Sequence, residues 1–119
     1  MEWNVLLDNE FADWLDSLSE TVRIEILASA GLLRIRGPQL GRPYVDTVKG
    51  SRFTNMKELR VQVGGDPWRI LFAFDPQRSA ILLVGGNKRG NKRWYKTWIP
   101  IAEARFARHL ESLNDSGGQ

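Results

Sequence analysis

The sequence has no cysteine and only one histidine, His109, among its 119 residues. The absence of cysteine excludes disulfides, thiolate nucleophiles and cysteine-ligated zinc, and it fits a reducing cytoplasm. A single histidine cannot build a histidine metal cluster, so we expect a structural or solvent-facing role for it. We therefore expect a cytoplasmic protein that uses neither a metal ion nor another cofactor.

Long apolar runs are missing too. None approaches the roughly 20 residues that span a bilayer, and the first residues, MEWN, are acidic where a secretory signal would be basic. The composition, 42% hydrophobic and 26% charged, suits one globular domain large enough to bury a core. We expect residues 1–113 to form that domain and residues 114–119 to be a polar tail that frays.

The two signs of charge are unevenly distributed along the chain. Residues 1–33 carry seven acidic side chains and one arginine, a net charge of −6. Residues 34–96 carry fourteen lysines or arginines and four acidic side chains, a net charge of +10. A protein divided in this way presents one surface that attracts polyanions. The pattern favours a nucleic acid, or an acidic protein that imitates one, as a partner.

The spacing of apolar residues predicts a series of helices and strands. They are a short strand at 2–7, a helix capped by Asp8, a second helix capped by Ser19 and ended by Gly37-Pro38, strands at 56–63, 68–74 and 80–86, and a helix entered at Ile99-Pro100. The three later strands form an antiparallel meander, and the strand at 80–86 is apolar on both faces, as a central strand is. This order predicts an α+β fold, a small antiparallel-rich sheet with the helices packed on one face, the two N-terminal helices among them.

A loop of nineteen residues, 37–55, separates the second helix from the meander. It is rich in glycine, proline and polar residues and is longer than structural loops usually are. Either the loop carries function, or packing of Leu40, Tyr44 and Val48 orders part of it.

Residues 86–96 read GNKRGNKRWYK, with five cations and no anion. A phosphate-binding P-loop is excluded, because Asn91 stands where that motif needs lysine and no Ser or Thr follows Lys92. The glycines and asparagines at 86, 87, 90 and 91 tolerate positive φ, so backbone N–H groups can turn toward an anion. The cations are Lys88, Arg89, Lys92, Arg93 and Lys96, and Trp94 and Tyr95 offer stacking surfaces. The alternative is a solvated loop whose aromatic residues pack under the last helix.

Arg60 and Arg69 each lie inside a predicted strand, on the face opposite its larger apolar residues. A guanidinium within a sheet needs a carboxylate or a phosphate. Glu58 is the obvious internal partner for Arg60, and the alternative is that both arginines surround a scissile phosphate. Clustered cations would stabilise the phosphorane formed when a ribose 2′-hydroxyl attacks. They would also lower the pKa of a neighbouring lysine or tyrosine, which could then act as base or acid.

Several stretches together resemble the RelE/ParE superfamily of toxins from type II toxin–antitoxin systems, most closely its HigB-like, phage-associated branch. They are GPQLGRPYVDTVKGSRFTNMKELRV at 37–61, WRILFAFDP at 68–76, GGNKRGNKRWYK at 85–96, and the helix entered at IPIAEARFARHL. The resemblance spans nearly the whole chain and implies a single RelE-like domain. The activity it implies is ribosome-dependent cleavage of mRNA through 2′-hydroxyl attack, without a metal.

The same resemblance implies roles for particular residues. Arg60 and Arg69 would bind the phosphate and the transition state, Lys88 would stabilise charge or act as base, and Tyr95 would be general acid, general base or stacking platform. The contacts to RNA would be Lys57, Arg89, Lys92, Arg93 and Trp94. The doubled GNKR leaves open which of Lys88 and Lys92 is catalytic, and the histidines of some relatives have no counterpart at residues 52–55.

The implied partners are the ribosome, mRNA and a cognate antitoxin with a helix-turn-helix domain and a segment that covers the basic face. Operator DNA would be bound only through the toxin–antitoxin complex, and no membrane is expected. Two other functions stay open: a ParE-like poison that binds DNA gyrase without cleaving, and a toxin-derived binding module without activity. The basic cluster favours RNA cleavage.

Overall fold

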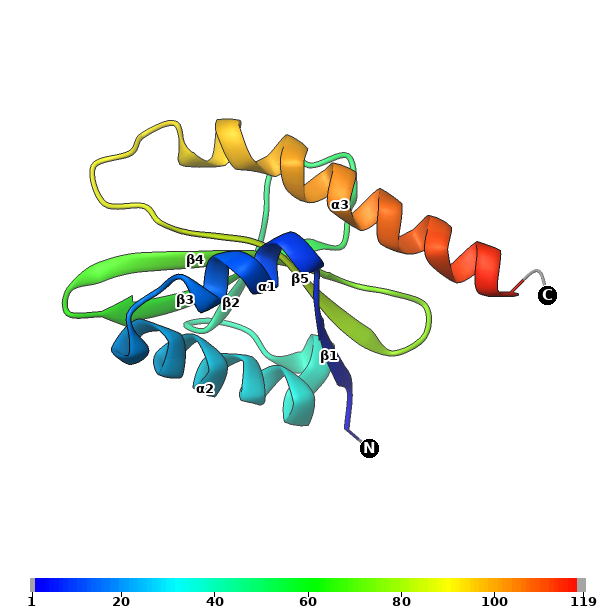
Figure 1. Cartoon of the computed structure of the whole chain (residues 1–119), viewed down its shortest axis with the longest axis horizontal. Coiled ribbons are helices and arrows are strands. Elements are labelled where there is room, and N and C mark those ends of the chain that lie inside the picture. The colour runs from blue at the N-terminus through cyan, green and yellow to red at the C-terminus, as the bar shows by residue number, and fades with distance from the viewer. Residues whose placement is uncertain (1, 118–119) are drawn as a thin grey trace.

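A five-stranded sheet crosses the middle of the protein, and a computed structural model describes residues 2–117, with side chains to residue 115. The elements are β1 (Asn4–Leu7), α1 (Asn9–Asp16), α2 (Glu20–Arg36), a short 3-10 turn (Gly37–Gln39), β2 (Val45–Thr47), β3 (Met56–Val63), β4 (Asp66–Phe74), β5 (Ser79–Asn87) and α3 (Trp94–Gly117). The strands lie in the order β1-β5-β4-β3-β2; β1 is parallel to β5 and the other pairs are antiparallel (Figure 1). The predicted α+β fold and the meander of β3, β4 and β5 are confirmed.

The N-terminal helices begin where their capping residues predict. The Asp8 carboxylate accepts the N–H groups of Glu10 and Phe11, and the Ser19 hydroxyl accepts that of Val22. The second helix ends at Gly37, whose φ is 55°. A Cβ at this position would collide with the indole of Trp3, so both the backbone and the packing require glycine.

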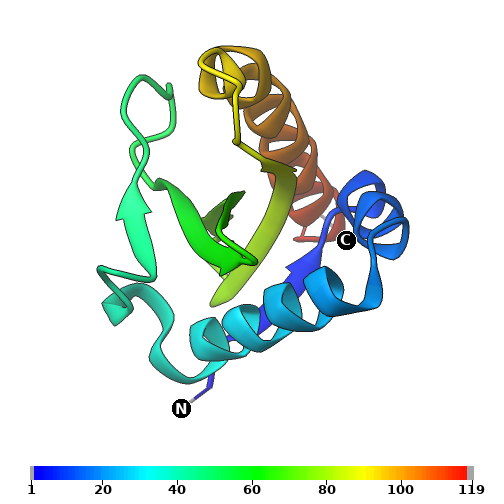
Figure 2. The same cartoon turned by 90° about the vertical axis from the view of Figure 1, so that its left-hand side faces the viewer.

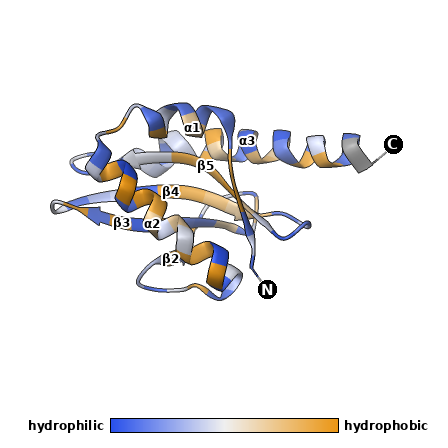
Figure 3. Ribbon diagram, turned by 60° about the horizontal axis from the view of Figure 1, so that its bottom comes forward, coloured by the Kyte–Doolittle hydropathy of each residue, from blue (hydrophilic) through white to orange (hydrophobic). Residues whose placement is uncertain are grey.

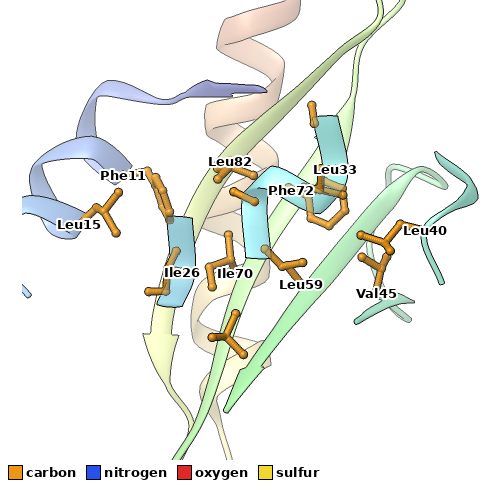
Figure 4. Close-up of a cluster of buried hydrophobic side chains, with 13 residues drawn as sticks. Phe11, Leu15, Ile26, Leu33, Leu40, Val45, Leu59, Ile70, Phe72 and Leu82 are labelled. Atoms are coloured by element: carbon orange, nitrogen blue, oxygen red, sulfur yellow. The ribbon is translucent and has the colours of Figure 1, made fainter. Parts of the chain in front are cut away.

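The face of the sheet toward α1 and α2 is closed by one apolar cluster (Figure 4). Alternate residues of the three long strands point into it, and those in the middle of the strands are buried. They include Leu59 and Val61 of β3, Ile70 and Phe72 of β4, and Ala80 and Leu82 of β5, packed against Phe11 and Leu15 of α1 and Ile26, Ala30 and Leu33 of α2. The middle of β4 and β5 is correspondingly coloured as hydrophobic in Figure 3.

The third helix packs on the opposite face, so the expectation that all helices share one face is wrong for α3. Its buried residues Ala102 and Phe106 contact Leu71, Ile81 and Leu83 in a second apolar cluster. Since β5 is apolar on both faces, its second face also needs a cover, and α3 supplies it. The helix packs chiefly on β4 and β5 and leaves β2 and β3 beside it (Figure 2).

The limits of α3 differ from those predicted. It begins at Trp94, so Pro100 lies inside the helix instead of near its first turn. It ends at Gly117, so residues 114–117 of the predicted polar tail are helical, and residues 118–119 lie outside the described part of the chain. No helix within residues 2–117 has the length and apolar character needed to cross a membrane.

The long loop is ordered by packing, the second of the two alternatives for this segment. Leu40, Val45 and Val48 are buried, whereas Tyr44 is exposed. The loop contains β2, a strand that the sequence did not predict, which pairs with residues 57–59 of β3. Beyond β2, the carboxylate of Glu103 on α3 accepts hydrogen bonds from the Ser51 hydroxyl and the Arg52 N–H, which tie the loop to the helix.

Candidate functional site

Arg60 and Arg69 lie directly opposite each other on β3 and β4. Both point to the α3 side of the sheet, because their neighbours Leu59 and Ile70 point into the cluster under α2. Glu58 shares this face, two residues before Arg60. The antiparallel register therefore brings two guanidinium groups and one carboxylate together on one face of the sheet, although Glu58 and Arg69 are eleven positions apart in sequence.

Glu58 is the centre of the cluster and is only 4% exposed. Its Oε2 accepts a hydrogen bond from Arg60 Nε at 3.1 Å, and Arg60 Nη2 lies at 3.0 Å. Its Oε1 accepts a hydrogen bond from the Tyr95 hydroxyl, and Arg69 Nε lies 3.9 Å from the same oxygen. The predicted pairing of Glu58 with Arg60 is therefore present, but Glu58 also joins Arg69 and Tyr95.

Tyr95 comes from the first turn of α3 and completes the cluster. Burial, and then the hydrogen bond from its hydroxyl to Glu58, raises the pKa of Tyr95 to about 12. This is the reverse of the expectation that nearby cations would lower a tyrosine pKa. The reason is that burial disfavours the charged phenolate and that the Glu58 carboxylate accepts the hydrogen bond of the phenol, and together these effects outweigh the lowering by Arg69. Tyr95 is thus neutral and a hydrogen-bond donor at neutral pH.

Lys88 approaches Tyr95 from the segment that follows β5. Its Nζ lies 3.3 Å from the Tyr95 hydroxyl oxygen and 4.7 Å from the centre of the ring. The structure therefore brings Lys88 to the cluster, whereas Lys92 lies further along the loop with an exposed side chain.

One hydrogen-bond donor of Arg69 has no acceptor among the described residues. Its Nη1 donates to the Trp68 carbonyl at 3.0 Å. Its Nε is buried and makes no hydrogen bond within the described part of the chain. A buried guanidinium donor without an acceptor is costly, and a phosphate oxygen is the acceptor that this group binds best.

A cleft of about 380 Å³ opens beside this cluster. Glu58, Arg60 and Tyr95 line one side, and the long loop lines the other with Arg42, Asp46, Thr47, Val48 and Lys49. Asp46 bridges the two sides, because its Oδ2 accepts hydrogen bonds from Arg42 at 2.9 Å and from Arg60 at 3.3 Å. The hydrogen bond from Arg42, followed by that from the Thr47 N–H, lowers the pKa of Asp46.

The remaining predicted RNA contacts are placed unequally. Lys92 and Arg93 are exposed and form no ion pair among residues 2–117. Arg89 is paired with Asp66, the first residue of β4. Lys57 is two residues before Leu59 on β3, so its side chain points to the α2 side of the sheet, opposite to Glu58. The structure therefore does not bring Lys57 to the cleft.

The structure does not expose Trp94 as the stacking surface that the predicted RNA contact needs. Its side chain is 2% exposed and packs between the start of α3 and β5, in keeping with the alternative left open for this loop, that its aromatic residues pack at the last helix. Gly86 is a β-strand residue, and a Cβ there would collide with the Trp94 indole. Among the four loop positions expected to allow positive φ, only Gly90 adopts it, at 69°. The loop is therefore not an extended phosphate-binding nest.

Two acidic residues matter more to the site than their sequence patterns indicate. The sequence predicts Glu58 only as a partner for Arg60, and it does not point to Asp46, because β2 has no recognisable pattern. The single histidine also acquires a partner: His109 Nε2 lies 2.8 Å from Oδ2 of the buried Asp75, consistent with a structural role. Within residues 2–117 no three His, Asp or Glu side chains are grouped so as to hold a metal ion.

Comparison with protein families and curated sequences gives close matches. A family model described as phage-derived protein Gp49-like matches residues 13–107. A protein of Mycobacterium tuberculosis (strain ATCC 25618 / H37Rv) that bears the name of toxin HigB3 is 47% identical over 114 residues, which cover 95% of this chain and 98% of that protein. A second protein of this strain, named toxin HigB2, is 47% identical over 105 residues, 87% of this chain and 52% of its own length. This chain thus spans about half of HigB2.

Solved structures agree on the fold. E. coli toxin RelE, a mutant in the free state, gives a TM-score of 0.62 at 12% identity, covering 88% of this chain and 98% of that chain. A chain of the archaeal RelE–RelB complex from Pyrococcus horikoshii OT3 gives a TM-score of 0.56 at 17% identity, covering 76% of this chain and 99% of that chain. At such identities the likeness shows the fold alone, and that fold is the predicted RelE-like one.

Proposed function

Since this chain belongs to the Gp49-like family of phage-derived proteins, as its resemblance to the HigB-like branch implied, we propose that it is the toxin of a toxin–antitoxin pair and that it cleaves mRNA on the ribosome. The observation that supports cleavage is the cluster of Glu58, Arg60, Arg69 and Tyr95 beside an open cleft. A surface that only bound RNA would not need a buried carboxylate hydrogen-bonded to a tyrosine, because the charge of the carboxylate opposes the binding of a phosphate.

The first step is attack of a ribose 2′-oxygen on the scissile phosphorus. Tyr95 is protonated at neutral pH, and Lys88 Nζ donates a hydrogen bond to its hydroxyl oxygen, so we assign the role of base to neither. Glu58 is the group in the cluster that can accept the 2′-hydroxyl proton. As the bond from O2′ to phosphorus forms, Arg60 and Arg69 stabilise the negative charge of the phosphorane. Arg69 Nε makes no hydrogen bond within the described residues, and it would donate to one of these oxygens if the bound phosphate reached it.

The second step is departure of the 5′-oxygen. Tyr95 donates its proton to that oxygen as the bond from phosphorus to O5′ breaks, and the ammonium of Lys88 stabilises the phenolate that remains. A phenol with a pKa of about 12 still protonates an alkoxide. The existing Tyr95–Glu58 hydrogen bond then returns the proton from Glu58 to the phenolate. The products are a 2′,3′-cyclic phosphate and a 5′-hydroxyl, and both side chains regain their starting protonation states.

The partners follow from this activity. The exposed Lys92 and Arg93, together with Arg42 and Lys49 at the cleft, would contact the RNA backbone of mRNA and ribosome. A protein with such a target would act in the cytoplasm. A cognate antitoxin would neutralise it, in line with the RelE–RelB complex of the archaeal neighbour, and only that complex would bind operator DNA.

The test is cell-free translation with the purified protein and mapping of mRNA ends by primer extension. Wild-type protein is expected to cut mRNA only on translating ribosomes. Arg69→Ala is expected to cut at least about 100-fold more slowly, the loss typical for one transition-state donor. Arg78→Ala is the matched control. Arg78 lies in the β4–β5 turn, at the end of β4 away from Arg69, and its guanidinium stacks on the Trp3 ring. Intact mRNA together with inhibited gyrase supercoiling would instead identify a ParE-like inhibitor.

A further inference from the structure

A second cavity, of about 350 Å³, lies between α1, the end of β5 and α3. Its lining includes Trp94 and Trp98 of α3 and not Tyr95, so it is distinct from the Glu58 cleft. The residues of the proposed cleavage reaction do not line it. Three tryptophans and two glycines do: Trp14, Gly85, Gly86, Trp94 and Trp98, which together form what we call the tryptophan slot.

One wall of the slot is an unpaired strand edge. β1 pairs only with Ser79–Leu82 of β5, so from Leu83 to Asn87 the described strand has a neighbour on the β4 side alone. The Leu83 carbonyl is satisfied by Arg105 Nη1 at 2.7 Å. Beyond it, Gly85 and Gly86 line the slot, and because glycine has no side chain, they line it with backbone atoms. Backbone N–H and C=O groups at an open edge are hydrogen-bond donors and acceptors in the plane of the sheet.

The other walls are flat aromatic rings above and below that plane. A Cβ on Gly85 would collide with the Trp14 ring, which comes from α1 on one face of the sheet. A Cβ on Gly86 would collide with the Trp94 indole, which comes from α3 on the other face. Trp98 follows one helical turn after Trp94 and is only partly buried. The paired glycines thus let indoles approach the strand end from both sides.

A ligand that fits this arrangement is a planar ring with donors and acceptors along one edge. It would bond to the open strand edge and stack on the partly exposed indoles of Trp14 and Trp98, as nucleobases do on aromatic side chains. The cavity holds a base with its sugar but is too small for a peptide strand with side chains, which would need space along the whole edge. Glu10, at the rim, does not leave an uncompensated negative charge, because Arg105 Nη2 and Arg108 Nη1 bind its carboxylate at 2.9 and 3.3 Å.

We propose that the tryptophan slot binds one base of the RNA strand whose scissile phosphate lies in the Glu58 cleft, and that it makes cleavage depend on the identity of that base. The inference rests on the proposed function. Continuity supports it: Asn87 lines the slot, and the next residue, Lys88, contacts Tyr95 in the cleft. A strand that crosses Lys88 would therefore reach both sites, and Lys92 lines the surface between Lys88 and Tyr95.

The direct test uses the wild-type protein and the five indole N–H signals of its tryptophans in NMR spectra. The probes are the four 5′-nucleoside monophosphates, with ribose 5-phosphate as a control that has no base. We expect nucleotides to shift the signals of Trp14 and Trp98 and to leave Trp3 unmoved, because Trp3 packs on Gly37 and Phe74, away from the slot. Absence of shifts at Trp14, Trp94 and Trp98, or equal shifts with ribose 5-phosphate, would overturn the proposal.

A second measurement uses Trp98→Ala and Trp98→Phe with a short single-stranded RNA. Loss of one stacking ring is expected to weaken binding about tenfold in Trp98→Ala, and Trp98→Phe should recover most of it. On ribosomes, Trp98→Ala should change which sites in an mRNA are cut. Wild-type binding and an unchanged set of cut sites in Trp98→Ala would refute the slot. The two proposals can fail separately. If the protein cleaves no mRNA but its indole signals still respond to nucleotides, the endonuclease proposal is refuted and base binding in the slot is not.

Discussion

The two faces of the sheet are closed to different degrees. Under α1 and α2, the side chains of β3, β4 and β5 are sealed in one apolar cluster. On the other face α3 covers β4 and β5, and next to it β3 presents Glu58 and Arg60 to a cleft of about 380 Å³. Both faces are made by the same strands, since successive residues of a strand point to opposite sides. One face is therefore wholly structural, whereas the other combines an apolar cluster with the proposed site, and substitutions at the site and in the sealed face should have separate effects.

The largest difference between an effect on activity and an effect on stability is expected at Glu58. Glu58→Gln keeps a side chain that can hydrogen-bond to Arg60 and Tyr95 but removes the proposed base, so the cleavage rate per folded molecule should fall by about 10²–10⁴. Single-turnover cleavage on ribosomes measures it. Glu111→Gln, an exposed position on α3, is the matched control. A Glu58→Gln protein that cuts as fast as wild type would show that the open face is not the active one.

The sealed face should respond in the opposite way. Phe72 is fully buried between α2 and the sheet, and Phe72→Ala should lower the free energy of unfolding by about 3–5 kcal/mol, the usual cost of such a cavity. Denaturant unfolding measures this loss. Ile24→Ala is the control, since Ile24 is an apolar residue that is 53% exposed on α2, and should change stability by about 0.5 kcal/mol or less. If the remaining folded Phe72→Ala protein cut mRNA poorly, the two faces would not be independent.

The pKa of Tyr95 offers a smaller and more specific test of the open face. The chain has two tyrosines, so Tyr44→Phe leaves Tyr95 alone, and its phenolate absorbance should rise with a midpoint near pH 12. Because the folded state raises this pKa above its ordinary value, the neutral phenol stabilises the fold fully below about pH 10. That contribution is lost as the pH rises from about 10 toward 12. Adding Glu58→Gln should lower the midpoint, and an unchanged midpoint would mean that Glu58 does not hold the phenol proton.

The smallest effect on stability is expected in the exposed loop. Replacing Lys92 and Arg93 by glutamine should change the free energy of unfolding by about 0.5 kcal/mol or less, because neither side chain is buried. Binding to RNA should nevertheless weaken, and the slope of log affinity against log salt should fall by about 1 for each phosphate that the variant no longer neutralises. Titrations at several salt concentrations measure it. Arg36→Gln, exposed at the end of α2, is the control and should leave the slope unchanged.

Local patterns were enough to predict much of this architecture. The alternation of Leu59 and Val61 with Glu58 and Arg60 predicted the strand and its two faces, and the capping residues Asp8 and Ser19 predicted the helix starts. The same alternation also placed Lys57 on the α2 face, a signal that conflicts with the assignment of this lysine to the RNA contacts. The face of the sheet to which a strand residue points is therefore a better guide to whether it belongs to the site than its charge is.

What could not be predicted depends on contacts between distant residues. Strand β2 has three residues, too few for a pattern, and it exists because β3 pairs with it. Tyr95 binds Glu58 from 37 positions away, so its raised pKa follows from tertiary packing and not from its basic neighbours in sequence. Trp94 is buried because Gly86 leaves room for it, a fit that becomes visible only once α3 is placed over β5.

Glu103 links the long loop, on one side of the cleft, to α3, on the other. By binding Ser51 and the backbone of Arg52, its carboxylate joins the tip of the long loop to the helix that carries Tyr95. The two sides of the cleft are thus connected at one end by the Glu103 hydrogen bonds and at the other end through the sheet, which fixes the distance between them. A phosphodiester bound as we propose would meet a cleft of fixed width, so little of its binding energy would be spent on bringing the two sides together.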